Sequence, residues 1–224
     1  MKYKINLIVS GVMIFGLLIY GFFIKSKYKK IDDNIDKFSV GIISEDLLSL
    51  QINKMRKLMD NSEFIFEVTC EEDLKYGFSY ASQTVKVEKV IKGDGVNVGD
   101  DINIVKITHV FIPDLQSGES YDNQFFNIDF VNCLKKGDKY IVLLDDVVDL
   151  GKNGLLFLYS DELYVSPYFK VGDVYAGPIE SDIEGAASVH YSKVKDYDFF
   201  ADSDEAIELW DDFCKEVTQN YTGN

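Results

Sequence analysis

The amino-acid sequence predicts a mainly β domain, an antiparallel barrel or sandwich of five to seven strands with flanking helices, preceded by one N-terminal transmembrane helix. Three observations support this prediction. An uncharged apolar run opens the chain, the residues between 63 and 165 follow the period of β-strands, and an apolar stripe with helical spacing lies at each end of that region. The 224 residues are enough for one sizeable hydrophobic core.

The apolar run from Ile5 to Ile24 predicts a membrane anchor. It carries no charge over twenty residues, and as a helix it would be about 30 Å long, the hydrocarbon thickness of a bilayer. A cleaved signal peptide usually has a shorter apolar core and a cleavage site of small residues, which the end of this run lacks. We therefore predict an uncleaved anchor with basic flanks over residues 1–30 and a single-pass location in the cell membrane.

The orientation of this anchor is predicted from two opposing signals. Two lysines precede the apolar run and five follow it, so the positive-inside rule favours a cytoplasmic domain. A short basic tail, an apolar run and a long polar domain are instead the usual order of a signal-anchor protein. We predict the second arrangement, with a charged linker over residues 31–43 and the soluble domain outside the cytoplasm.

The acidic charge lies entirely beyond the predicted anchor. All 38 acidic residues and 17 of the basic residues follow residue 30, which gives residues 31–224 a net charge of −21. Such a surface repels nucleic acid and anionic lipid, so we expect no nucleic-acid partner. It would attract cations or basic partners.

Two amphipathic helices flank the predicted strands. The first spans residues 44–60 and begins at a serine that can cap it. The second covers residues 201–221, with Asp202 or Ser203 as its cap. Trp210, the only tryptophan, lies on the apolar stripe of this second helix. We expect both helices to pack on their own domain.

Runs rich in β-branched and aromatic residues, separated by Gly, Asp or Asn, form the predicted strands. An acidic, loop-rich region follows over residues 171–200, and we place one domain over residues 44–200. The apolar residues of the strands and the tryptophan predict this core: Phe64, Phe66, Val68, Val85, Val87, Ile102, Ile104, Tyr140, Val142, Leu144, Leu156 and Trp210.

Gly-Asp pairs mark the predicted turns. Lys-Gly-Asp occurs twice, and on an exposed loop this tripeptide can serve in cell adhesion. Each pair lies close to the end of a predicted strand, where glycine suits a positive φ and aspartate can accept hydrogen bonds from free backbone amides. We therefore interpret as structural turns the residues Gly93, Asp94, Gly99, Asp100, Gly137 and Asp138, with a fourth pair at Gly172 and Asp173.

The three cysteines leave two alternatives open. Cys70 and Cys133 each lie at a strand boundary and form a candidate disulfide if the domain is outside the cytoplasm. Three reduced thiols are the alternative. Cys214 lies on the apolar face of the second helix, so we expect it to be a small buried residue.

The sequence contains none of the enzyme motifs that we sought. Its two histidines, His109 and His190, have no His or Cys at metal-ligand spacing, so we predict no metal site and no cofactor. A Gly-x-Ser-x-Gly elbow and glycine-rich phosphate loops are also missing. We predict no catalytic residues and no enzymatic activity.

A helix followed by "NSEFIFEVTC", "TVKVEKVIKGDGVNVGDDINI" and "LKKGDKYIVLL" gives the chain a recognisable order of elements. This order resembles the oligonucleotide/oligosaccharide-binding (OB) barrel of the netrin and tissue-inhibitor-of-metalloproteinases type, as it occurs in bacterial surface proteins. The resemblance covers residues 50–165 approximately. It implies an OB-like barrel with exposed loops.

Three function hypotheses follow from the sequence. The first is a membrane-anchored, extracytoplasmic module that binds a protein or a small extracellular ligand. The second, which the resemblance permits, is an inhibitor or regulator of an extracellular hydrolase. The inhibitors of that family place an N-terminal cysteine on the protease zinc, and the sequence offers no such cysteine. The third is an enzyme of unrecognised type.

Overall fold

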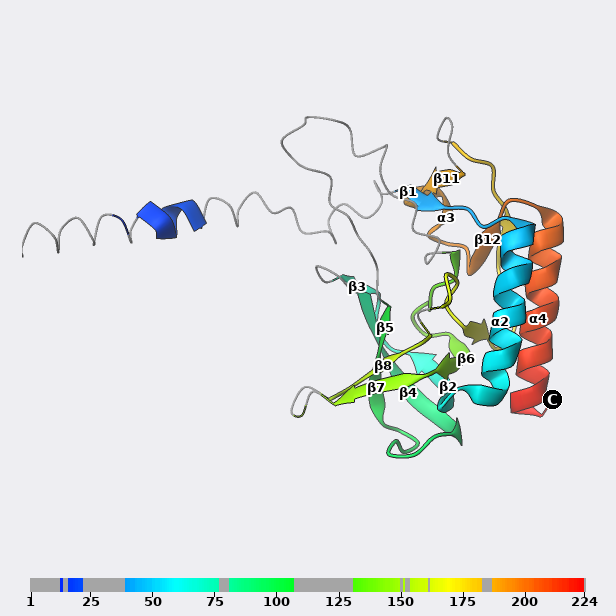
Figure 1. Ribbon diagram of the computed structural model, residues 1–224, viewed down its shortest axis with the longest axis horizontal. Coiled ribbons are helices and arrows are strands. Elements are labelled where there is room, and N and C mark those ends of the chain that lie inside the picture. Colours follow the sequence, from blue (N-terminus) through cyan, green and yellow to red (C-terminus); the bar gives the residue numbers. More distant parts are fainter. Residues whose placement is uncertain are drawn as a thin grey trace, which may run out of the picture. The chain divides into compact units, whose positions relative to one another are not determined.

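The computed structural model describes residues 13, 16–21, 39–76, 81–106, 131–149, 151, 154–160, 162–182 and 187–223 (Figure 1). The chain divides into two compact units, residues 1–35 and residues 36–224, and each is described by itself. In the first unit, residues 16–21 are helical and exposed. The second unit contains the sheets and the long helices.

The predicted membrane anchor at residues 5–24 is corrected by the structure. Within the described part of the chain, no helix is long and apolar enough to cross a membrane. The predicted single-pass location in the cell membrane, with the orientation that depended on it, is corrected with it. The rest of the predicted anchor and residues 31–38 of the linker lie outside the described residues.

The main sheet has eight strands, seven of which follow one path in the order β7-β8-β5-β4-β2-β6-β9, while β3 pairs with β4 beside that path. Its pairs are antiparallel except for β5 and β8, which run parallel. The bounds are β2 Phe64–Cys70, β3 Lys75–Tyr76, β4 Ala81–Lys92, β5 Asp101–Lys106, β6 Lys139–Leu144, β7 Asp146–Asp149, β8 Leu155–Leu158 and β9 Tyr168–Lys170.

The sheet confirms a mainly β fold with flanking helices, but the predicted closed antiparallel barrel is wrong. Among the described strands, no pairing joins β7 to β9, so the path has two ends. At both ends of this path, polar side chains form hydrogen bonds with backbone groups. The Asn132 amide donates to the carbonyls of Ser166 (2.6 Å) and Tyr168 (2.9 Å), and the Asp146 carboxylate accepts from the Val147 amide (2.7 Å). Such contacts protect edge strands from further pairing.

The curvature of the sheet nevertheless brings distant strands together through side chains. Phe157 of β8 meets Phe64 and Phe66 of β2 edge-on, with ring centroids 5.1 and 5.6 Å apart, although β5 and β4 separate these strands in the sheet. Tyr159, one residue beyond β8, contacts Tyr168 of β9 at 5.8 Å. The ends of the sheet therefore approach each other by aromatic packing.

The predicted acidic loop region at residues 171–200 contains short regular elements. β1 (Ser39–Gly41) pairs antiparallel with β11 (Ser188–His190), and β10 (Ala176–Pro178) pairs parallel with β12 (Phe199–Ala201). A single helical turn, α3 (Tyr191–Val194), follows β11. Strands of three residues are too short for periodicity to reveal, and each partner is distant in the sequence.

Two long helices, α2 (Glu45–Asn61) and α4 (Asp204–Thr222), lie side by side (Figure 1). The hydroxyls of Ser44 and Ser203 accept from backbone amides of the first turn, so both helices are capped as the sequence predicts. Near their ends, Arg56 pairs with Glu216 at 2.7 Å and the Tyr221 hydroxyl donates to the Met59 carbonyl at 3.0 Å. Since both contacts join the second halves of the helices, α2 and α4 run in the same direction.

The central strands β2 and β6 bury both of their faces. Phe66 and Val142 belong to an inner cluster enclosed by the curved sheet, whereas Ile65 and Ile141 belong to a second cluster beneath α2 and α4. Eleven of the twelve predicted core residues are buried, and Leu156 is half-buried. Trp210 belongs to the second cluster, while the ten buried strand residues on that list line the inner one.

Trp210 joins α4 to two separate sheets. Its ring stacks on Phe199 of β12 at 4.6 Å and on Phe169 of β9 at 5.7 Å. We predict that Trp210→Ala lowers the free energy of unfolding by about 3–5 kcal/mol, because it removes the largest buried side chain and leaves a cavity. Urea unfolding measures the loss. Asn220→Ala on the exposed face of α4 is the control, and equal stability of the two variants would contradict the role of Trp210.

Gly93 is required at the turn after β4. Its φ is +109°, and a Cβ atom there would lie 2.5 Å from Cδ1 of Phe64. Gly95 also has a positive φ of +81°, but nothing lies within 4 Å of its Cβ position. We predict that Gly93→Ala lowers stability by about 2–4 kcal/mol, from backbone strain and overpacking together, and Gly95→Ala by about 1–2 kcal/mol from strain alone. Thermal unfolding of both variants tests this difference, which disappears if Phe64 does not restrict the site.

Candidate functional site

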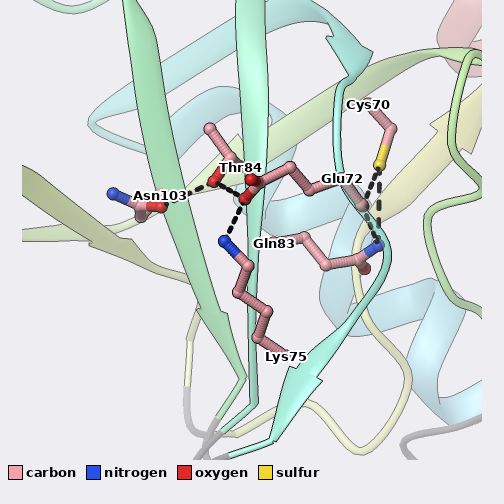
Figure 2. A network of polar contacts seen from close by, with 6 residues as sticks. All are labelled: Cys70, Glu72, Lys75, Gln83, Thr84 and Asn103. Atoms are coloured by element: carbon pink, nitrogen blue, oxygen red, sulfur yellow. Dashed lines mark hydrogen bonds and ion pairs between the residues drawn. The ribbon is translucent and has the colours of Figure 1, made fainter.

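A network of polar side chains lies at the end of β2, beside the pair formed by β4 and β5 (Figure 2). Glu72 follows β2 by two residues, and Lys75 belongs to β3. Gln83 and Thr84 are neighbours in β4, and Asn103 of β5 is the register partner of Thr84. Because adjacent strand residues point to opposite faces, Thr84 lies on the outer face of the sheet and Gln83 faces inward.

The Glu72 carboxylate organises the exposed half of the network. Its Oε2 atom forms an ion pair with Lys75 Nζ and accepts a hydrogen bond from the Thr84 hydroxyl. These two bonds, that from Lys75 first, lower the pKa of Glu72 below its ordinary value. The carboxylate is therefore ionised at neutral pH, and 40% of the side chain remains exposed.

Thr84 connects Glu72 to the next strand. Its Oγ1 lies 3.1 Å from Oδ1 of Asn103. A hydroxyl has one proton, and Thr84 donates it in the hydrogen bond to the Glu72 carboxylate. Towards Asn103, Thr84 can therefore only accept a hydrogen bond. The oxygen and nitrogen of a side-chain amide are assigned from the surrounding hydrogen bonds. Here the assignment places the NH₂ group of Asn103, in place of its oxygen, next to Thr84. Three strands, β3, β4 and β5, thus share one chain of polar contacts.

Gln83 supports the network from the buried side. Its side chain is 4% exposed, and its Nε2 donates to the Leu134 carbonyl at 3.0 Å. The same nitrogen lies 3.3 Å from the Glu72 carbonyl and 3.5 Å from Cys70 Sγ. Gln83 therefore ties the segment that carries Glu72 to the chain before β6.

Cys70 is the only sulfur in the network (Figure 2). Its Sγ donates to the Glu72 carbonyl at 3.2 Å. Burial is the main cause that raises the pKa of the thiol to about 11. At neutral pH the group is a protonated thiol, which is a poor nucleophile and a poor metal ligand.

The outer face of the sheet continues the polar character of the site. Thr69 of β2 donates to Glu88 of β4 at 2.7 Å, and Lys86 lies 3.8 Å from Glu71. All four side chains are at least partly exposed. The outer face thus has an apolar part under α2 and α4 and a polar part along β4 and β5.

The three cysteines are alike in burial and in redox state. Cys70, Cys133 and Cys214 are all buried and present as thiols, so the candidate bridge between Cys70 and Cys133 is not formed in the structure. The Gln83 amide joins Cys70 to the carbonyl of Leu134, the residue next to Cys133. The disulfide itself, which depends on redox surroundings, stays a prediction.

The Gly-Asp residues lie at turns with glycine in the conformation that a turn requires. Gly93, Gly99, Gly137 and Gly172 all have positive φ angles, between 89° and 110°. Asp100 accepts from the Asn97 amide at 2.8 Å within its own turn. Asp138 instead contacts Lys170 of β9, and no pattern in the sequence predicts this contact.

Asp138, Lys170 and Asp198 form a second cluster. Lys170 Nζ lies 2.7 Å from Asp138 and 2.8 Å from Asp198. Burial opposes the charge of Lys170, but the bonds to both carboxylates outweigh it and raise the pKa of the amine. Asp198 also accepts from the Tyr175 amide at 2.8 Å. These residues lie far apart in the sequence, so no local pattern predicts the cluster.

A third cluster links β11 to the residues before it. Asp182 lies 2.9 Å from both His190 Nδ1 and Lys193 Nζ. Burial works against its charge, but the bonds from Lys193 and His190 prevail and lower the pKa of Asp182. His109 lies outside the described residues. Among the residues that the structure describes, no group of three or more His, Cys, Asp or Glu could hold a metal ion.

The chain was compared with models of known protein families and with curated proteins, and neither comparison gave a match. The resemblance to the netrin and tissue-inhibitor type therefore stays a prediction. The candidate site is defined by its geometry alone, as a preorganised polar surface supported by a buried amide.

The Cys70 thiol predicts an alkaline loss of stability. In the unfolded chain the thiol ionises near its ordinary pKa of 9.0, and in the folded protein near 11. Between these values the unfolded state binds fewer protons, so the stability contribution is complete below pH 9 and decreases as the pH rises towards 11. We predict that Cys70→Ala makes this decrease shallower in urea unfolding at a series of pH values. Val68→Ala, which removes apolar volume from the same strand, should keep the original slope.

Proposed function

We propose that the domain is a binding or interaction module that contacts a protein or a small ligand through the outer face of β4 and β5 and the Glu72 network. The observation that most supports this proposal is the fixed charge at Glu72. The carboxylate is ionised, bonded to Lys75 and Thr84, and still 40% exposed.

Preorganisation is the physical reason why such a face suits recognition. A side chain that is already held by neighbours loses less conformational freedom when a partner binds. Thr84 and Asn103 add a hydroxyl and an amide beside the carboxylate, so the face offers donors and acceptors in fixed positions. The buried Gln83 supports this arrangement by anchoring the Glu72 carbonyl.

Charge narrows the class of partner. The net charge of −21 over residues 31–224 opposes nucleic acid and other polyanions. Neutral polar ligands and partners with basic groups fit the face better.

The test compares partner capture by variants of the full chain. Glu72→Gln removes the carboxylate charge, and Thr84→Ala removes the hydroxyl that holds it. Glu208→Gln is the matched control, because it removes one exposed acid from α4. We expect the unaltered chain and Glu208→Gln to retain a partner from a lysate of the native cells. The other two variants should lose it or bind it at least about tenfold more weakly, because a hydrogen bond to a charged group contributes about 1.5–3 kcal/mol.

Capture that is equal for all four proteins would contradict the proposed face. Circular dichroism of each variant confirms that the fold is kept. A captured hydrolase whose activity falls on binding would assign the module to the inhibitors or regulators of such enzymes.

A further inference from the structure

A stacked pair of tyrosines lies beside β10 and β12. The rings of Tyr175 and Tyr197 have centroids 4.7 Å apart and an interplanar angle of 14°. A hydrogen bond with Tyr175 raises the pKa of Tyr197, so the two phenol groups are joined as well as stacked. Tyr175 keeps 58% of its surface exposed, although its ring is stacked on that of Tyr197.

The backbone that carries the pair is held from beneath. The Tyr175 amide donates to the Asp198 carboxylate at 2.8 Å, and the Asp198 amide donates to the Tyr175 carbonyl at 2.7 Å. Asp198 is 6% exposed and paired with Lys170. A Cβ atom at Gly177 would lie 3.0 Å from the ring of Tyr197. The absence of a side chain at Gly177 therefore leaves room for this ring.

The two rings differ in their relation to the core. Tyr197 is half-buried and packs against the cluster beneath α2 and α4, whereas Tyr175 is exposed and belongs to neither hydrophobic cluster of the described residues. A rigid aromatic surface that remains exposed is typical of recognition sites, because it offers a large contact area at a small entropic cost.

The charges around the pair select the ligand. Asp173 and Asp196 are exposed and lie within two residues of Tyr175 and Tyr197 respectively. Of the bases, Lys195 is exposed, the Lys135 ammonium donates to the Lys195 carbonyl, and Lys170 is paired with Asp198. The face of a tyrosine ring is itself negative and attracts cations. The acidic domain as a whole adds a long-range attraction for positive charge. A positively charged side chain of a partner could be lysine or arginine. Arginine stacks on aromatic rings better than lysine, because its guanidinium group is planar and weakly hydrated.

We propose that the Tyr175–Tyr197 pair is a docking platform for an arginine side chain in a basic segment of a partner protein. The platform uses none of the residues of the Glu72 network, and it does not depend on the function proposed for that face. Arginine stacks on the exposed ring of Tyr175, and Asp173 and Asp196 attract its charge.

The experiment titrates the full chain with a synthetic tetra-arginine peptide at low ionic strength and measures the dissociation constant by calorimetry. Tetra-citrulline is the probe control, because it keeps the planar group and lacks the charge. Tyr175→Ala should weaken binding about two- to fivefold, the effect of a surface cation–π contact. Tyr175→Phe keeps the ring face and should bind as the unaltered chain does. Tyr164→Ala is the matched control, since Tyr164 is 55% exposed and contributes no ring to the pair.

Nuclear Overhauser contacts between the Tyr175 ring and the arginine side chain provide a second readout that does not rely on a variant. Equal affinity of Tyr175→Ala and the unaltered chain would overturn the proposal, because binding would then reflect the acidic surface alone. Binding of tetra-citrulline as tightly as tetra-arginine would also overturn it.

Discussion

The burial of β2 and β6 on both faces is the constraint on which the remaining packing depends. Alternate residues of β2 enter two cores: Phe66 enters the inner cluster of the curved sheet, and Ile65 the cluster under the helices. Both faces of this strand pair are apolar and must be shielded from water, so each face needs other elements packed against it. The helices α2 and α4 supply one cover, through the ring contacts of Trp210, and the folding over of β4, β5 and β8 supplies the other.

The curvature that forms the inner core also creates the candidate site. Phe157 can reach Phe64 only if the sheet bends far enough to bring β8 over β2. That bend turns the outer sides of β4 and β5 away from α2 and α4, and the outward residues there are polar. The inner side chains Val85 and Ile102 are buried while Thr84 and Asn103 stay accessible. Core and candidate site are therefore the two faces of the same strands.

Local patterns in the sequence predicted the elements that depend on local physics. Serine caps and apolar stripes located α2 and α4, and the two-residue period located β2, β4 and β6 with nearly all of the core. The closed antiparallel barrel was wrong because, among the described strands, no pairing joins β7 to β9 and β8 runs parallel to β5. The period of a strand does not indicate which strand it pairs with. The site was missed for a similar reason. Gln83, Thr84 and Glu72 look like ordinary surface residues until the fold places them together, and the links from Lys170 to Asp138 and Asp198 span distant segments.

Both proposed surfaces share one design, an exposed group held by a buried polar residue. Gln83 fixes the Glu72 segment through the Glu72 and Leu134 carbonyls, and Asp198 fixes the Tyr175 backbone through its amide and carbonyl. A buried polar group destabilises the fold unless its hydrogen bonds are satisfied. An apolar residue at position 83 or 198 would carry no such cost. Gln83 and Asp198 bond to backbone groups that carry the exposed side chains, so each limits the motion of a surface residue. Buried Gln51 holds the backbone amide of the exposed Tyr164 at 2.8 Å in the same way, so what sets Glu72 and Tyr175 apart is the anchor together with the groups beside them, the Thr84 hydroxyl at Glu72 and the stacked Tyr197 ring at Tyr175.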